Sequence, residues 1–196
     1  MQKVAVLLAE GFADWEYALI GGTGGPFYGL EIQYVTLGAA HLTSQGGMLV
    51  RVDHTAGDLA QMHPGVIVVI GGTIWETDRV PDVGAALRAH HAGGGTVAGI
   101  CGGTLALARA GLLDNCAHTS NDPAFLTDHA AGYTGQGHYV NQSAAVRDAS
   151  VITAPGTAPV SFAAEVFRAA GLAAETVMQF RAMLAAEHNT NKAGQT

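Results

Sequence analysis

The hydrophobic positions of the chain fall into short continuous runs separated by glycine-rich turns. A continuous apolar run of strand length predicts a strand covered on both faces, because a strand with one solvent face alternates instead. Such runs occupy residues 3–9, 66–70, 96–100 and 151–154. The alternating segment 31–37 predicts a further strand, and 41–52 predicts a β-hairpin around Ser-Gln-Gly-Gly.

Helical patterns lie between these strands. We predict helices over 14–28, 81–91, 102–110, 123–130, 159–170 and 176–188, and short or edge strands over 117–120, 138–140 and 144–147. Strands that alternate with helices predict an α/β fold with a mostly parallel, doubly wound sheet. We find no repeat, linker or break in composition, so residues 1–188 are expected to form one domain and 189–196 a frayed polar tail.

Composition restricts the class of protein. The 196 residues are 48% hydrophobic and 13% charged, which favours a compact domain over a disordered chain. A net charge of -7 argues against nucleic-acid binding. No apolar run is long enough to cross a bilayer, and the N-terminus is better explained as a first strand than as a signal peptide. Two cysteines make no disulfide framework, so a reducing cytoplasm is the expected compartment.

Cys101 follows the predicted strand 96–100 directly and precedes Gly102, Gly103 and a predicted helix. In an open α/β sheet, ligands bind beyond the carboxyl ends of the strands, and a tight strand-to-helix turn at that place is a nucleophile elbow. The helix N-terminus favours a thiolate, and the N–H of Gly102 is placed to bind an oxyanion. The alternative is a buried cysteine that acts as a small hydrophobic residue, which we favour for Cys116.

The chain resembles the PfpI-type superfamily, which includes intracellular proteases of that name, the parkinsonism-associated protein deglycase and isocyanide hydratases. The resemblance rests on the order and spacing of five segments along nearly the whole chain. They are GFADWE at 11–16, VIGG at 69–72, AGICGG at 98–103, GHY at 137–139 and APGTAPVSF at 154–162. It implies a three-layer α/β sandwich of the class I glutamine amidotransferase-like type, related to flavodoxin-like folds.

The resemblance also implies roles for individual residues. Glu16 is expected to approach the sulfur of Cys101 as a protonated carboxyl beside a thiolate. Gly72 is expected to offer its N–H as an oxyanion donor opposite Gly102. From position alone, Glu16 is better explained as an exposed acid that complements the dipole of the first helix, and the resemblance favours the role in the site.

The chain departs from the family after the elbow helix. Many members have a histidine there, whereas ungapped alignment places Asn121 at that position and His118 three residues earlier. Asparagine orients or hydrogen-bonds but is no base near pH 7, which argues against a protease-type Cys–His dyad. Glutamine amide hydrolysis is disfavoured too, because no His-x-Glu pair follows Val151.

Several residues flank the candidate site in sequence. Trp15, Trp75 and Tyr139 are candidates to line it, with Trp75 either a pocket wall or a cover of a sheet edge or dimer contact. His138 is the favoured functional histidine by resemblance, against a structural hydrogen bond. No metal site is expected, since the histidines lack ligand spacing, and no organic cofactor, since no dinucleotide-binding motif follows a strand.

Two classes of function remain from the sequence. The first is a cysteine-dependent enzyme in which Cys101 adds to an electrophilic carbon of a small molecule or modified protein side chain. Amide hydrolysis, hydration and glyoxalase or deglycase chemistry all belong to this class. The second is a non-catalytic redox-sensing or chaperone-like stress protein with an oxidisable Cys101. The resemblance implies a homodimer in both cases.

Overall fold

The computed structural model describes residues 2–188. It has a seven-stranded sheet in the order β5-β2-β1-β6-β7-β9-β8, parallel except for β8, which runs antiparallel to β9. The strands are β1 (Val4–Leu8), β2 (Ile32–Thr36), β5 (His54–Thr55), β6 (Val66–Val69), β7 (Thr96–Ile100), β8 (Val146–Asp148) and β9 (Val151–Ala154). A separate hairpin pairs β3 (His41–Thr43) with β4 (Leu49–Arg51).

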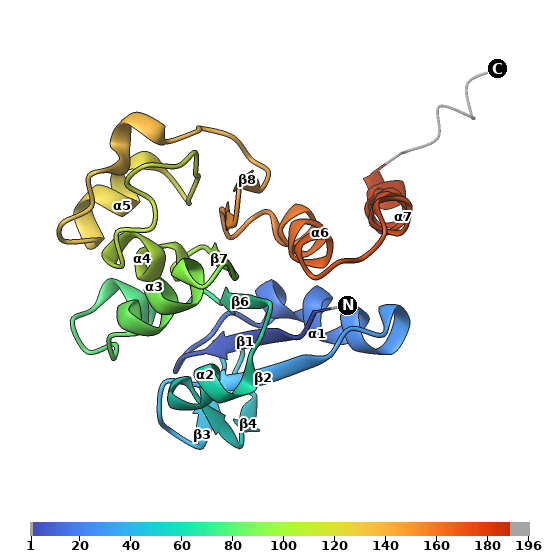
Figure 1. Cartoon of the computed structure of the whole chain (residues 1–196), viewed down its shortest axis with the longest axis horizontal. Helices are drawn as coiled ribbons and strands as arrows, with labels where there is room; N and C mark the ends of the chain where they lie inside the picture. The colour runs from blue at the N-terminus through green and yellow to red at the C-terminus, as the bar shows by residue number, and fades with distance from the viewer. Residues whose placement is uncertain (1, 189–196) are drawn as a thin grey trace.

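Helices cover both faces of the sheet and make three layers, as Figure 1 shows. They are α1 (Asp14–Tyr28), α2 (Leu59–Met62), α3 (Gly84–Ala92), α4 (Gly103–Arg109), α5 (Pro123–His129), α6 (Pro159–Ala169) and α7 (Ala174–Ala185). Helices α1, α6 and α7 pack on one face, and α2 to α5 on the other. The predicted α/β sandwich with a mostly parallel, doubly wound sheet is therefore confirmed.

Alternation within the buried strands supplies both halves of the core. In β1, Val4 and Val6 pack with Phe162 of α6, while Ala5 and Leu7 face the opposite cluster. Successive side chains of a strand point to opposite faces, so a strand between two helical layers must be apolar throughout. This explains why the continuous apolar runs mark the strands accurately.

Glycines let α1 lie close to its neighbours although they weaken its intrinsic helix propensity. A Cβ on Gly24 would lie 3.1 Å from the Phe167 ring and 3.2 Å from Ile32, and a Cβ on Gly21 would collide with the Tyr34 hydroxyl. The helix over 14–28 forms as predicted because its close packing on β2 and α6 outweighs its propensity.

Two predicted strands are absent. Segment 117–120 forms only a single bridge between His118 and Tyr139, and part of 138–140 belongs to a 3-10 turn over Gly135–His138. The N–H of Thr119 donates to the Thr153 side chain instead of a strand partner. The short segments β5 and α2 were not predicted, because so few residues carry no periodicity.

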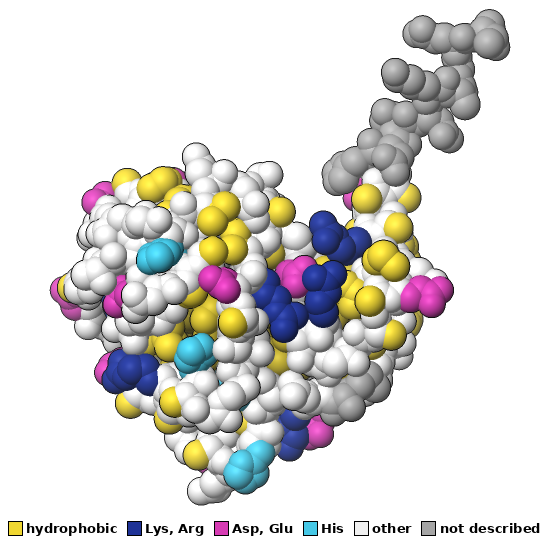
Figure 2. Space-filling model, turned by 45° about the horizontal axis from the view of Figure 1, so that its top comes forward, with side chains coloured by type: hydrophobic (Ala, Val, Ile, Leu, Met, Phe, Trp, Pro, Cys, Tyr) yellow, Lys and Arg dark blue, Asp and Glu magenta, His cyan; other side chains and the backbone are white. Residues whose placement is uncertain are grey.

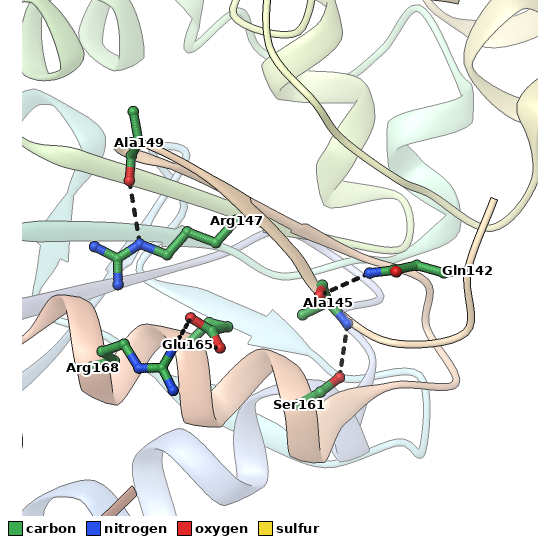
Figure 3. Close-up of polar contacts among 7 residues, drawn as sticks. All are labelled: Gln142, Ala145, Arg147, Ala149, Ser161, Glu165 and Arg168. Atoms are coloured by element: carbon green, nitrogen blue, oxygen red, sulfur yellow. Dashed lines mark hydrogen bonds and ion pairs between the residues drawn. The ribbon is translucent and has the colours of Figure 1, made fainter. Parts of the chain in front are cut away.

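The antiparallel edge of the sheet is held to α6 by side chains as well as by the ladder. Figure 3 shows Ser161 of α6 accepting from the N–H of Ala145, while Arg147 donates to the carbonyl of Ala149. Ser161 thus anchors the chain that leads into β8, next to the end of β9 where the candidate site begins.

Charged residues make up only 13% of the chain. Figure 2 shows mostly neutral atoms on the face it presents, with histidines that lie apart from one another. Among residues 2–188, no group of three His, Cys, Asp or Glu side chains is arranged to hold a metal ion, and no helix is long and apolar enough to cross a membrane. The predicted tail 189–196 lies outside the described residues.

Candidate active site

The candidate site lies where the carboxyl ends of four adjacent strands meet. The sheet order changes direction between β1 and β6, which is the place where open α/β sheets bind ligands. Glu16 follows β1, Gly72 follows β6, Cys101 follows β7 and Gly156 follows β9. The fold therefore brings together residues that are up to 140 positions apart in the sequence.

Cys101 occupies a left-handed backbone conformation with φ of 53°. This conformation is uncommon for a residue with a Cβ and marks an imposed geometry. The N–H of Cys101 donates to the Ala154 carbonyl at 2.9 Å, and the Thr104 hydroxyl donates to the Cys101 carbonyl at 2.6 Å. These bonds hold the turn in place, and the predicted nucleophile-elbow geometry is present.

The glycines beside Cys101 are required by close backbone contacts. A Cβ on Gly102 would lie 2.7 Å from the Gly72 carbonyl oxygen, and a Cβ on Gly103 would collide with the Val69 carbonyl. The elbow therefore packs directly on the turn after β6. Its two glycines serve this approach as well as access to the sulfur.

Glu16 is completely buried, and its carboxyl faces the elbow. Oε2 accepts a hydrogen bond from the Gly71 N–H at 2.7 Å, whereas Oε1 has no well-formed partner among the described residues. A Cβ on Gly156 would lie 3.2 Å from Oε1 and 3.0 Å from the Cys101 sulfur, so both atoms border one small space. The alternative of an exposed helix acid is wrong for Glu16.

Burial raises the pKa of Glu16 from 4.5 to about 7, with the Gly71 N–H and the Cys101 thiol acting in the opposite direction. Burial and the negative charge of Glu16 raise the pKa of Cys101 to about 11. The expectation of an acidic thiol is therefore wrong while Glu16 is ionised. When Glu16 is protonated its charge disappears, and the pair behaves as two groups that compete for one proton.

Two hydrogen-bond donors act in favour of the thiolate. Asn121 Nδ2 lies 3.3 Å from the Cys101 sulfur, and its amide together with the Gly102 N–H lowers the thiol pKa. Neither Gly72 nor Gly102 donates its N–H in the loop and turn backbone hydrogen bonds of residues 2–188. The backbone nitrogen of Gly72 lies beside Gly102, whose own N–H interacts with the Cys101 sulfur, so the two N–H groups are neighbours next to the nucleophile.

Asn121 is the one residue of the segment after α4 that reaches Cys101 by a hydrogen bond. His118 does not face the sulfur: it is buried, with Nδ1 bound to the Cys116 carbonyl and Nε2 to the Tyr133 hydroxyl at 2.6 Å. Because both ring nitrogens are occupied away from the elbow, the candidate role of His118 in the site is wrong.

Two other pocket candidates lie elsewhere. The Trp75 indole is buried beneath the elbow and donates to the Ile70 carbonyl at 2.9 Å, so it supports the turn. The cavity that Trp75 borders, together with Arg109 and Ala131, contains neither Cys101 nor Glu16. His138 is exposed at the end of a 3-10 turn and contacts His118 through its carbonyl, with no hydrogen bond to the elbow. Neither side chain belongs to the cluster around Cys101.

Two residues are more closely involved in the site than their sequence positions indicate. The N–H of Gly156 donates to Asn121 Oδ1, and its carbonyl accepts from the Trp15 indole, both at 3.0 Å. Trp15 was expected only to flank the site, and Gly156 had no expected role of its own. The only sequence signal for Gly156 was its place inside the APGTAP segment after a buried strand.

Comparison with known proteins identifies the family of the chain. The model of the DJ-1/PfpI family matches residues 2–169. The chain belongs to the DJ-1/PfpI family. Among curated DJ-1/PfpI relatives, the uncharacterized proteases YoaZ and YdeA of Bacillus subtilis (strain 168) are each 31% identical to this chain. The alignments span 178 and 165 residues, with 85% and 83% of this chain and 82% and 80% of the relatives covered.

Solved structures of the DJ-1/PfpI family share the whole architecture. The DJ-1 superfamily protein Atu0886 from Agrobacterium tumefaciens superposes with a TM-score of 0.90 at 36% identity, covering 96% of this chain and all of that one. The thiJ/pfpI family protein from Bacillus anthracis gives a TM-score of 0.78 at 26% identity, covering 95% of this chain and 91% of that one. These likenesses establish the family, while the reaction has to be argued from the site.

Proposed function

We propose that this DJ-1/PfpI protein is an enzyme in which Cys101 adds to the carbonyl carbon of a small electrophile, with a 2-oxoaldehyde as the favoured substrate class. The observation that carries the proposal is the elbow itself. Cys101 is held in a left-handed conformation between the unpaired oxygen of Glu16 and the amide of Asn121. Strain of this kind persists only where the surroundings impose it.

The first step is addition. The Cys101 thiolate attacks the aldehyde carbon, and the π electrons of the carbonyl move to its oxygen. The N–H groups of Gly72 and Gly102 stabilise that oxyanion. Glu16, protonated in the fraction of molecules that carry the thiolate, gives its proton to the oxygen and becomes a carboxylate. The product is a thiohemiacetal.

The second step uses the same carboxylate. Glu16 removes the proton from the thiohemiacetal carbon, which gives an enediol. The hydroxyl proton of that carbon passes to the oxygen of the neighbouring carbon, and Glu16 returns its proton to the neighbouring carbon itself, so one carbon is oxidised and the other reduced. Water then hydrolyses the resulting thioester to a 2-hydroxy acid and the free thiol. No outside oxidant or reductant is consumed. A carboxyl with a pKa of about 7 suits both directions of proton transfer near neutral pH.

Carbonyl addition fits the site better than peptide hydrolysis, although the two curated relatives carry the name protease. An amide needs a proton donor for the departing amine, which cysteine proteases take from histidine. Among residues 2–188 no histidine hydrogen-bonds Cys101, and the side chain that does so from the segment after α4 is Asn121.

The test is turnover of methylglyoxal, followed as formation of lactate. Wild-type protein and the Cys116→Ser variant should turn over equally, because the Cys116 thiol donates to the Leu112 carbonyl and lies outside the site. Cys101→Ser should lose all turnover and keep its fold by circular dichroism. Turnover that survives in Cys101→Ser would overturn the proposal. Oxidation of Cys101 without any turnover would favour the redox-sensing alternative.

A further inference from the structure

Trp15 is a half-exposed indole that nevertheless makes a directed hydrogen bond. It lies in the first turn of α1 with 48% of its surface exposed. Its Nε1–H donates to the carbonyl of Gly156, which lies 141 positions later in the chain, at 3.0 Å. Water alone would satisfy an exposed indole N–H, so this contact fixes the two segments relative to each other.

Gly156 continues the connection toward the sulfur. Its N–H donates to Asn121 Oδ1 at 3.0 Å, and Asn121 Nδ2 lies 3.3 Å from the sulfur of Cys101. A backbone N–H only donates, so the atom of Asn121 that faces it must be the carbonyl oxygen. The NH₂ group is thereby directed at the sulfur, where it is a donor to a thiolate.

Asn121 needs this restraint because its side chain is exposed. An unrestrained surface amide samples several rotamers and presents its oxygen to the sulfur as readily as its nitrogen. Gly156 also sets the room above the sulfur, since a Cβ there would lie 3.0 Å from it. A displacement of Gly156 therefore changes both the direction of the amide and the space for substrate.

We propose that Trp15 is a positioning residue for Cys101: its indole N–H holds Gly156, Gly156 orients the Asn121 amide, and the amide keeps a donor on the sulfur. The inference rests on the proposed role of Cys101 as nucleophile, but it concerns the state of the sulfur and is measured there. The charged side chain that borders the Cys101 sulfur is Glu16, whose negative charge raises the pKa of the thiol. The connection from Trp15 through Gly156 to Asn121, called the relay below, contains no titrating group.

The experiment compares the rate of alkylation of Cys101 by iodoacetamide against pH in four proteins. These are the wild type, Trp15→Phe, Asn121→Ala and the double variant, with peptide mass spectrometry to separate Cys101 from Cys116. Trp15→Phe keeps an aromatic ring and removes the N–H. Phe27→Leu, on the same helix and 76% exposed, is the matched control and should react like the wild type.

We expect Asn121→Ala to slow alkylation at a fixed pH below the thiol pKa by about tenfold or more, as for the loss of a hydrogen bond to a charged group. Trp15→Phe should slow it by about three- to tenfold, since the amide is loosened but not removed. The double variant should match Asn121→Ala, because Trp15 acts only through Asn121. Trp15→Tyr is a second variant that also lacks the indole N–H, should Trp15→Phe fold poorly.

An unchanged rate in Trp15→Phe would overturn the inference. So would independent, multiplicative effects in the double variant, since Trp15 would then act on the sulfur by another route. The predicted rates combined with no turnover of methylglyoxal would reject the proposed function and leave the relay standing. Turnover of methylglyoxal together with unaltered alkylation rates in the variants would reject the relay and leave the proposed function standing.

Discussion

Replacement of Glu16 by glutamine should alter how the stability of the protein depends on pH. Glutamine keeps the shape of the side chain and an oxygen for the Gly71 N–H, which donates to Glu16 at 2.7 Å. It removes the one carboxyl of the site, which is completely buried. Any pH dependence that comes from this group must therefore be missing from the variant.

The size of the effect follows from the difference in the pKa of Glu16 between the folded and the unfolded protein. Burial raises this pKa from 4.5 to about 7 in the folded protein. At pH values between 4.5 and about 7, Glu16 has lost its proton in the unfolded chain and still holds it in the folded chain. The free energy of unfolding therefore falls as pH rises through this range. A tenfold difference in proton affinity corresponds to about 1.4 kcal/mol, and the whole window gives a loss on the order of 3 kcal/mol, complete above pH 7.

The assay is urea unfolding of both proteins between about pH 4.5 and 8, followed by circular dichroism. The free energy of unfolding of Glu16→Gln minus that of the wild type should increase by about 3 kcal/mol across this range. Taking the difference removes the contributions of the titrating groups that do not interact with Glu16. Cys101 does interact with it, but the pKa of Cys101 in the wild type, about 11, lies above this range. Parallel pH curves for the two proteins would refute the reasoning, because Glu16 would then have the same pKa in the folded and unfolded states.

Three further substitutions separate the site from its supports. Gly156→Ala should slow alkylation of Cys101 by about tenfold or more, because its Cβ would lie 3.0 Å from the sulfur. In the control Gly137→Ala, the new Cβ meets nothing within 4 Å and the rate should stay unchanged. Equal alkylation rates in the two variants would contradict the geometry. His118→Phe should lower the free energy of unfolding by about 1–3 kcal/mol in urea, through loss of its bonds to Cys116 and Tyr133, without changing Cys101 reactivity. Thr104→Val should lower it by a similar amount, about 1–3 kcal/mol, because the hydroxyl binds the Cys101 carbonyl, whereas Thr104→Ser should retain most of that stability.

The parts of the fold that could be predicted are those set by local pattern. The buried strands 96–100 and 151–154 were predicted with their observed bounds, because burial between two helical layers makes strands apolar throughout. The helix 14–28 was also predicted with its observed bounds, although its glycines weaken the local pattern and packing on β2 and α6 stabilises it. The strands expected at 117–120 and 138–140 do not form. The N–H of Thr119 donates to the Thr153 side chain, and a single bridge between His118 and Tyr139 joins the two segments. Those partners are decided by tertiary structure.

The candidate site divides in the same way. Cys101 and its glycines could be identified because a strand-to-helix turn has a local signature, and Glu16 was found through the family resemblance. Trp75 and His118 were misplaced because a position near the site in sequence does not tell which way a side chain points. Gly156 carries its role through backbone atoms, which no residue type reveals.

The most direct test of the account is the pH profile of Cys101 alkylation in the wild type and in Glu16→Gln. If Cys101 and Glu16 compete for one proton, the wild-type rate should first rise near pH 7, where the pair loses its first proton, and again near the thiol pKa of about 11. Glu16→Gln should show a single rise, at a pH below the upper step, because the Coulomb repulsion is gone. Cys116, whose pKa burial also raises to about 11, should react identically in both proteins. A wild-type Cys101 that follows one titration near its thiol pKa of about 11, unchanged by Glu16→Gln, would contradict the shared proton and with it the proposed chemistry.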